Sequence, residues 1–439
     1  MTGSPSFWLF LAASTALLVG LDYYVYRNWK VFVALRSRRL ERPSRLRLSL
    51  PLYRVFMALM PLTLPLSFYL WRWWEVEPKA VRAALIGLWL AYYLPKALVA
   101  LGLLIKDGAR FVVWLFGWFQ EQLASPPTDP PAAEPASPAS LDLSDMKRMR
   151  RREFLQQMGW TAASVPFVVV GYSVFRTLYD FAVMRVDVPI AGLPRQLDGL
   201  TIAQLSDLHA GSFFSPRPME EVVHLVNGLR PDVVAITGDF VNRDAAELPT
   251  ILPALADLQA ELSVVGCLGN HDHYAQVQEV ARGIQGTGVD LLINQHQALD
   301  IDGAQLYLIG TDNTGFRQHY ANLPAAMQGI PAEPTGRDAR ILLAHDPTFW
   351  DHHVRPQRPD IDLMLCGHTH GGQIGFEMGP VRWGLARVAY ARWAGLYSER
   401  RLDHTSLHHL YVNRGTGTVG PPLRLGIRPE ITLLTLRAA

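Results

Sequence analysis

Cysteine and excess charge are both scarce in this sequence. Charged residues make up 18% of its 439 residues, and 41 Lys and Arg against 39 Asp and Glu leave a formal net charge of +2. This balance provides no strong basic field, so we expect no nucleic-acid partner. The 2 cysteines, Cys267 and Cys366, form neither a spaced zinc motif nor a disulfide framework. We expect both to pack in the core, and a disulfide between them is the alternative in an oxidising compartment.

Long hydrophobic runs, by contrast, fill the first third of the chain. Residues 7–26, 50–71 and 83–105 each approach the ~20 apolar residues that a helix needs to cross a bilayer. Residues 1–123 are therefore predicted to form a membrane domain with about three transmembrane helices. Lys96 lies inside the third run and indicates either a buried functional group or, as the alternative, a lysine that faces the helix bundle or a short water defect.

The following segments connect this domain to the rest of the chain. Residues 110–123 are too short to cross a membrane again, and we expect them to lie in the interface or to extend the third helix. Residues 124–150 contain a linker rich in proline and alanine, followed by the basic run KRMRRR. The apolar stretch 154–179 then predicts a fourth transmembrane helix, an uncleaved anchor within residues 151–182.

From residue 195 to the C-terminus the pattern is that of an α/β domain. Short runs rich in Val, Ile and Leu end in Gly, Asp, Asn or His and are followed by helical or loop sequence. Because ligand sites in such sheets form where loops leave the carboxyl ends of strands, we expect polar residues after several strands to share one pocket. The predicted strands are residues 201–205, 233–237, 264–268, 305–310, 341–344, 362–366, 410–413 and 430–436.

Five of these strand ends carry residue types that bind metals. In chain order they read SDLH (206–209), GD (238–239), GNHD (269–272), AHD (344–346) and GHTHGG (367–372). Their carboxylate, amide and imidazole groups suit Mn, Fe, Zn, Ni or similar ions, and the lack of thiolate disfavours a soft-metal or iron–sulfur site. A lone His or Asp is usually structural, but five such segments in succession favour a metal site.

These five segments resemble the signature blocks of the calcineurin-like metallophosphoesterase family, and the resemblance covers residues 195–439. The extended GHTHGGQ (367–373) and the late VNRG (412–415) further resemble a membrane-associated, twin-arginine-linked branch of that family. The resemblance implies an α/β (α+β) fold, a four-layer sandwich of two mixed sheets flanked by helices, preceded by the all-α transmembrane region. It also implies a hydrolase that acts on phosphate esters.

Seven residues of this sequence match the ligands of the family's two divalent metal ions. The resemblance assigns one ion to Asp207, His209 and His370, the other to Asn270, His345 and His368, and the bridge between them to Asp239. Two divalent ions carry more positive charge than the two carboxylates and one bridging hydroxide offset, so the centre attracts a phosphate oxyanion. The choice among Mn, Fe, Zn and Ni stays open.

Three further residues are candidates for catalysis or substrate binding. His271 matches the family's catalytic histidine, which protonates the leaving alkoxide, and Asp272 follows where it would orient the ring. The alternative for His271 is a hydrogen-bonding role beside the ligands. Arg414 follows a predicted strand in a glycine-rich turn, where its planar guanidinium would hold a substrate phosphate unless it is a solvated surface residue.

The leading hypothesis for function is hydrolysis of a phosphate ester or pyrophosphate by metal-activated hydroxide, with a phosphorylated small-molecule or lipid-linked substrate. The membrane anchor and relatives with that activity also favour a narrower hypothesis, a pyrophosphatase that acts on a nucleotide-linked lipid precursor. A third is a catalytically silent membrane scaffold. The complete ligand set disfavours the scaffold, because a protein without catalysis has no need of seven metal-binding residues.

Basic residues predict the sidedness of the membrane domain. The loop between the first two runs contains a single acidic residue, Glu41. Its basic residues are Arg27, Lys30, Arg36, Arg38, Arg39, Arg42, Arg45 and Arg47. The positive-inside rule places this loop in the cytoplasm, so the third helix returns the chain to the cytoplasm and the fourth carries it out again. We therefore expect a multi-pass protein of a bacterial-type cytoplasmic membrane, with the catalytic domain on the periplasmic side.

The start of the fourth helix also resembles an export signal. Arg151 and Arg152 open the segment RREFL, which is similar to a twin-arginine signal, although Arg150 stands where Ser or Thr is usual and Gln156 where Lys is common. The alternative is that the arginines only fix the orientation of the helix.

We predict that protease added to intact spheroplasts digests the catalytic domain. Replacing both Arg151 and Arg152 by Lys keeps the positive charge and removes the pair that a twin-arginine receptor reads, so the variant loses protease sensitivity only if that pathway exports the domain. Immunoblotting of the domain provides the measurement. If the domain stays protected while a known outer-face marker is cleaved, the topology is wrong.

Overall fold

The structure of the chain is a computed structural model that describes residues 5–39, 45–73, 79–123, 143–313, 320–378, 381–401, 406–420 and 422–439. The chain divides into two compact units, Met1–Tyr172 and Ser173–Ala439. We call the first the helical unit and the second the sheet unit, and describe each by itself.

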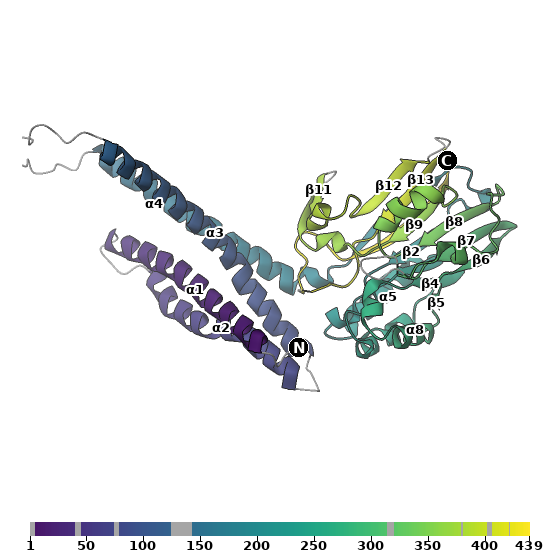
Figure 1. Cartoon of the computed structure of the whole chain (residues 1–439), viewed down its shortest axis with the longest axis horizontal. Coiled ribbons are helices and arrows are strands. Elements are labelled where there is room, and N and C mark those ends of the chain that lie inside the picture. The colour runs from purple at the N-terminus through teal and green to yellow at the C-terminus, as the bar shows by residue number, and fades with distance from the viewer. Residues whose placement is uncertain are drawn as a thin grey trace, which may run out of the picture. The chain divides into compact units, whose positions relative to one another are not determined.

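Long helices make up the described part of the helical unit. They are α1 (Pro5–Arg39), α2 (Ser49–Trp73), α3 (Lys79–Leu123) and α4 (Leu143–Phe175), drawn in purple to teal in Figure 1. The first three predicted apolar runs each lie in one of them, and the fourth, residues 154–179, lies in α4 as far as Phe175. Helix α3 continues without a break through residues 110–123, so this segment extends the third helix. Helix α4 already includes the basic run, and the predicted linker at 125–140 lies outside the described residues.

Many apolar side chains of the helical unit are exposed. Leu9, Leu17 and Val113 are 75%, 74% and 73% exposed. Surface of this composition suits contact with lipid. Among the described residues, the segment Gly87–Gln122 of α3 is long and apolar enough to cross a membrane. The crossings by α1, α2 and α4 stay predictions.

A buried ion pair joins α1 to α3. The carboxylate of Asp22 contacts the ammonium of Lys96, and the two side chains are 0% and 1% exposed. Tyr92 and Tyr93 each donate a hydroxyl hydrogen bond of 3.0 Å to the same carboxylate, and the ammonium lies 3.4 Å from the centre of the Tyr92 ring. A charge in apolar surroundings is tolerated when it is paired and hydrogen-bonded in this way. Lys96 therefore faces the helix bundle, as one of the two sequence-based alternatives predicted.

The sheet unit contains two six-stranded mixed sheets, with strand orders β1-β14-β2-β3-β4-β5 and β12-β13-β9-β8-β7-β6, and a two-stranded sheet β10-β11 (Figure 1). The first sheet consists of β1 (Ala182–Ile190), β14 (Glu430–Ala438), β2 (Thr201–Leu205), β3 (Val233–Thr237), β4 (Ser263–Cys267) and β5 (Asp290–Leu291). The second consists of β12 (Gly395–Arg400), β13 (Leu407–Val412), β9 (Leu363–Cys366), β8 (Asp338–Leu343), β7 (Ala304–Gly310) and β6 (Gln295–Ile301). The small sheet pairs β10 (Gly375–Met378) with β11 (Val381–Gly384).

Alternating side chains along the strands give the sheet unit its four layers. In β2, Ile202 faces the core between the two sheets, whereas Ala203 and Leu205 face helices on the outer side, as a period of two requires. The helices on that side are α5 (Arg217–Leu229), α6 (Leu252–Leu255) and α8 (Val277–Gln285). The second sheet packs its outer face against α9 (Leu323–Ala326) and residues 349–354. The predicted four-layer sandwich is therefore confirmed.

Each of the eight predicted strands matches an observed strand, with ends that differ by at most three residues, but the domain begins earlier than residue 195. Strand β1 already pairs in parallel with β14, from Ala182 opposite Glu430 to Ile190 opposite Ala438. Its Val188 and Ile190 are buried between the sheets. The pattern of β1 is hard to separate in the sequence because it comes directly after the apolar run of the fourth helix.

Both cysteines are free and buried. Cys267 lies in the core between the two sheets, and Cys366 lies in the core under the outer face of the second sheet. The expectation that they pack as small apolar groups is confirmed, and the alternative of a disulfide between them is wrong.

We predict that Asp22→Asn destabilises the chain by about 3–5 kcal/mol, because it leaves the Lys96 ammonium buried without a charged partner. The thermal midpoint of the full-length protein in detergent measures the loss. The double variant Asp22→Leu with Lys96→Met is the control, since it removes both charges and should recover much of the stability. If the single variant melts at the wild-type temperature, the pair makes no contribution.

Candidate metal centre

Parallel strands in both sheets bring the five motif segments to one place. Strands β2, β3 and β4 are parallel neighbours in the first sheet, and β8 and β9 are parallel neighbours in the second. The motif loops leave the carboxyl ends of these strands. Hydrogen bonds connect the loops of the two sheets: His368 N donates to Asp207 Oδ2 at 3.0 Å, and His345 Nδ1 lies 2.7 Å from Thr237 O. The site therefore occupies the edge where the two sheets meet.

The backbone at this edge has an unusual conformation. A non-glycine residue rarely adopts a positive φ, because its Cβ then crowds the backbone. Five of the predicted ligands nonetheless have one: Asp207 (50°), His209 (46°), Asp239 (58°), His368 (68°) and His370 (51°). Backbone hydrogen bonds hold this conformation, such as Asp207 N to Gly238 O at 3.0 Å. Conformations of this kind cluster at functional sites.

Three predicted ligands form a first group of donor atoms, Asp207, His209 and His370. The Nε2 atoms of His209 and His370 are 3.0 Å apart, and His370 Nε2 is 3.3 Å from Asp207 Oδ1. Ligand atoms that share one ion lie roughly 3 Å apart when each metal–ligand distance is about 2 Å. All three residues are buried, so their atoms converge on a space that suits a cation.

A second group consists of Asp239, His345 and His368. His345 Nε2 lies 3.1 Å from Asp239 Oδ2 and 3.3 Å from His368 Nδ1. A carbonyl oxygen only accepts hydrogen bonds, so His345 Nδ1 carries a proton that it donates to Thr237 O, and its Nε2 faces the group. This orientation is the one that a metal ligand needs.

Asp239 lies between the two groups. Its Oδ2 is 3.6 Å from His209 Nε2 in the first group and 3.1 Å from His345 Nε2 in the second. Its Oδ1 accepts a hydrogen bond of 2.8 Å from the backbone N of His271, which fixes the plane of the carboxylate. Asp239 thus lies where one carboxylate could contact ions at both groups, and its bridging role stays a prediction.

The seventh predicted ligand, Asn270, adds an unsatisfied oxygen. Its side chain is 4% exposed, and its Oδ1 has no hydrogen-bond partner among the described residues. A buried amide oxygen without a partner is costly, and a metal ion would satisfy it. The donor set of carboxylate, amide and imidazole atoms, without thiolate, fits divalent ions such as Mn, Fe, Zn or Ni.

Burial and the attraction between carboxylates and imidazoles shift the pKa values of the side chains at this site. Burial raises the pKa of Asp207 to about 6 and lowers the pKa of His209 to about 3. Burial also opposes a charge on His345, but the Asp239 carboxylate outweighs it and raises the pKa of His345 to about 10. Burial acts to raise the pKa of Asp239, yet the surrounding imidazoles, His345 foremost, lower it. Positive charge is therefore most favourable beside Asp239.

His271 and Asp272 do not contact each other as the sequence suggested. His271 Nδ1 lies 2.5 Å from Asn242 O, to which it donates, and its ring is edge-on to the His209 ring at 4.8 Å. The Asp272 carboxylate instead accepts backbone hydrogen bonds from Asp239 N (3.0 Å), Phe240 N (2.8 Å) and Gly269 N (2.9 Å). Asp272 thus organises the backbone of two metal loops, and the carbonyl of Asn242 orients the His271 ring.

Arg414 has partners that a substrate clamp would not have. Its side chain is buried, and its guanidinium forms ion pairs with Glu430 and Glu377. The carboxylate of Glu430 also accepts a hydrogen bond of 2.6 Å from Tyr411. Because carboxylates already engage the guanidinium, the expected phosphate-binding role is not favoured, and the alternative of a solvated surface residue is wrong.

Sequence reasoning missed one buried cation near the site, Arg424. The side chain is 0% exposed. Its Nη2 donates to the carbonyl oxygens of Arg414 (3.0 Å) and Gly415 (2.9 Å) and lies 3.4 Å from His370 Nδ1. Arg424 thus holds the loop after β13 against the ligand His370. No sequence signal identifies it, because it lies in a loop outside the five motif segments.

Two family profiles match the chain. Residues 200–372 match the family described as calcineurin-like phosphoesterase, and residues 6–178 match the one described as probable calcineurin-like phosphoesterase, transmembrane domain. The uncharacterized metallophosphoesterase YkuE of Bacillus subtilis is 30% identical to the chain, over 67% of the chain and 99% of YkuE. The phosphodiesterase YaeI of Escherichia coli is 30% identical, over 53% of the chain and 80% of YaeI.

More distant or partial similarities are also present. The transmembrane protein with metallophosphoesterase domain of Bos taurus is 35% identical over 59% of the chain and 57% of its own length, so the chain spans a little more than half of that relative. Among solved structures, the Haemophilus influenzae NAD nucleotidase aligns with 49% of the chain and 45% of its own, at 13% identity and a TM-score of 0.35.

The chain therefore belongs to the calcineurin-like metallophosphoesterase family. It is a membrane protein of that family, with an N-terminal transmembrane phosphoesterase domain ahead of the metallophosphoesterase domain. The family resemblance in the sequence is thereby confirmed, whereas the twin-arginine branch stays a prediction.

We predict that Asp239→Asn weakens binding of Mn²⁺ at both positions by roughly 100-fold or more, because a neutral amide bridges two cations poorly. Metal analysis and calorimetric titration of the full-length protein provide the measurement. The matched control is Asp312→Asn, a nearby carboxylate that pairs with His273 Nε2 at 2.7 Å and belongs to neither group. Two tightly bound ions in the Asp239 variant would contradict the bridging assignment.

Proposed function

We propose that the chain hydrolyses a phosphate ester or pyrophosphate at a centre for two divalent ions. The observation that carries this proposal is the position of Asp239 Oδ2 between two groups of donor atoms, 3.6 Å from His209 Nε2 and 3.1 Å from His345 Nε2. The partnerless oxygen of Asn270 supports a cation at the second group. The first ion would be held by Asp207, His209 and His370, and the second by Asn270, His345 and His368, with Asp239 shared.

Two ions so held would supply a hydroxide nucleophile at neutral pH and would stabilise the charge of a phosphoryl group during in-line attack. The residues of the chain position this chemistry. The two buried carboxylates compensate part of the cationic charge and leave an excess that attracts an anionic substrate. Asp272 maintains the loop geometry through its backbone hydrogen bonds, and no side chain is required as a covalent nucleophile.

His271 is the proposed general acid. Its Nδ1 donates to Asn242 O, so Nε2 is the ring nitrogen that can exchange a proton with the substrate. The residue is only partly buried, and its ring lies 4.8 Å from that of His209, so it borders the first donor group without belonging to it. This placement suits protonation of a leaving alkoxide.

The proposal also covers the class of substrate and the side of the membrane on which the catalytic domain lies. The transmembrane domain favours a substrate at the membrane, and a nucleotide-linked lipid precursor is the narrower candidate. The basic loop after the first helix supports a catalytic domain outside the cytoplasm. The complete donor set disfavours a catalytically silent scaffold, because a scaffold has no need of convergent buried donor atoms.

The proposal is tested by measuring hydrolysis by the full-length protein in detergent for each combination of metal ion and substrate. The metal-free protein would be loaded with Mn²⁺, Fe²⁺, Zn²⁺, Ni²⁺ or Mg²⁺ in turn and offered phosphomonoesters, phosphodiesters and pyrophosphates, with nucleotide-linked lipids among them. We expect turnover that depends on metal and is lost in Asp239→Asn. Tight binding of two ions without turnover of any substrate would favour the scaffold.

We predict that His271→Ala keeps both metal ions and loses rate mainly on substrates with poor leaving groups. Loss of a general acid costs roughly 10²–10⁴-fold for an alkyl ester and little for a nitrophenyl ester, whose leaving group needs no proton. Rates across a series of esters of increasing leaving-group pKa provide the measurement. His224→Ala, an exposed histidine on α5, is the matched control. Equal losses on alkyl and nitrophenyl esters would rule out this role for His271.

A further inference from the structure

The helical unit contains a cavity of about 950 Å³ between α1, α3 and α4. Small residues create it: Gly102 of α3 and Gly159 of α4 both line it, and a Cβ added at either would meet no atom within 4 Å. The volume lies near the top of the roughly 300–1,000 Å³ range of small-molecule sites. The cavity is thus large enough for a ligand and is not an ordinary packing defect.

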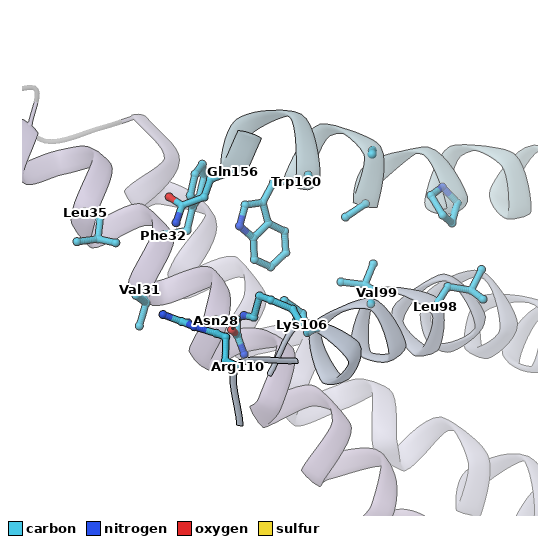
Figure 2. Close-up of a pocket in the computed structure, with 16 residues that line it drawn as sticks. Asn28, Val31, Phe32, Leu35, Leu98, Val99, Lys106, Arg110, Gln156 and Trp160 are labelled. Carbon is cyan, nitrogen blue, oxygen red and sulfur yellow. Dashed lines mark hydrogen bonds between the residues drawn. The ribbon is translucent and has the colours of Figure 1, made fainter. Parts of the chain in front are cut away.

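The walls of this cavity are apolar. Figure 2 shows Val31, Phe32 and Leu35 of α1 on one side and Leu98 and Val99 of α3 on another. These five side chains offer no hydrogen bonds to a polar ligand, and they suit a hydrocarbon chain, for which burial among apolar side chains is favourable. Gln156 of α4 adds a polar side chain to the lining.

An aromatic side chain of α4 faces these walls. In Figure 2 the indole of Trp160 points into the space between α4 and the other two helices. Its ring is edge-on to Trp29 at 4.9 Å and lies 6.0 Å from Phe32. Tryptophan is enriched where the apolar part of a bilayer meets the headgroups. A tryptophan in this lining suits a cavity that reaches the level of lipid headgroups.

Cationic side chains also line the cavity. Lys106 and Arg110 of α3 lie next to Asn28 of α1, as Figure 2 shows. Lys106 Nζ donates to Asn28 Oδ1 at 3.0 Å and to Asp107 Oδ1 at 3.1 Å, which leaves one of its three donor positions for another acceptor. The carboxylate of Asp107, 3.1 Å from Lys106 Nζ, offsets one of the two cations. An excess of positive charge remains, and both cationic side chains are exposed.

We propose that this cavity binds an anionic phospholipid, with an acyl chain between the apolar walls and the headgroup phosphate on Lys106 and Arg110. Charge complementarity selects this occupant, because a phosphate oxyanion matches a guanidinium fork and an ammonium. The basic run at residues 147–152 belongs to α4, the same helix as Trp160, which is typical of segments that contact anionic lipid. The proposal concerns the helical unit alone and holds whether or not the sheet unit is catalytic.

Native mass spectrometry of the full-length protein tests the proposal. Detergent-solubilised protein would be titrated with phosphatidylglycerol, with phosphatidylcholine and with inorganic phosphate. We expect phosphatidylglycerol to bind roughly tenfold or more tightly than phosphatidylcholine, because two cations near the headgroup favour an anionic lipid. Inorganic phosphate should not displace it, since a free anion lacks the acyl chain.

Two variants and one control locate the site. The double variant Lys106→Gln with Arg110→Gln should lose the preference for phosphatidylglycerol, and Gly102→Leu with Gly159→Leu should lose both lipids because it fills the cavity. The matched control is Arg27→Gln with Lys30→Gln, which removes two exposed cations of α1 outside the cavity and should bind as wild type does.

Several outcomes would overturn the proposal. A preference for phosphatidylglycerol that survives the Lys106 and Arg110 changes but is lost in the control would place the lipid elsewhere. Wild-type lipid binding by the filled variant would exclude the cavity. Full competition by inorganic phosphate would mean that the cations bind a free anion instead of a lipid. Size-exclusion chromatography of each variant separates loss of binding from loss of folding.

Discussion

The carboxylate of Asp239 stands between two clusters of nitrogen and oxygen atoms, and much of the sheet unit serves to hold it there. Asp272 accepts a hydrogen bond from its backbone N, and the backbone N of His271 donates to its Oδ1. The other oxygen, Oδ2, is left to face His209 and His345. Because both clusters are buried, their lone pairs and charges are unfavourable without a cation, so the arrangement is best explained as a metal-binding one.

The layered fold explains how residues far apart in sequence meet around that carboxylate. Two sheets stacked on a shared apolar core place the carboxyl ends of β2, β3, β4, β8 and β9 along one edge. The chain must turn sharply at each of these ends, which accounts for the positive φ of five candidate ligands. The core therefore stabilises a backbone conformation that would be unfavourable in isolation.

The helical unit also contains charged side chains in apolar surroundings, and it accommodates them in two ways. The Asp22 and Lys96 side chains neutralise each other and are surrounded by tyrosine hydroxyls and rings, so their polar groups are satisfied internally. Lys106 and Arg110 instead line a cavity with exposed side chains, where part of their charge is uncompensated. Internal pairing favours a structural role for the first pair, whereas exposure to a ligand favours binding by the second.

The sequence by itself determined the class of fold, most strands, the long apolar helices and the seven candidate ligands. These features depend on local patterns: apolar periodicity marks helices and strands, and the strand-end rule places polar residues at one edge. Only the tertiary structure decided the partners of Lys96, Asp272, Arg414 and Arg424. Their contacts join residues distant in the chain, such as Lys96 with Asp22, 74 positions apart, and Arg424 with His370, 54 positions apart. A buried charge is satisfied by whichever group packing brings within hydrogen-bond distance, and no local pattern carries that information.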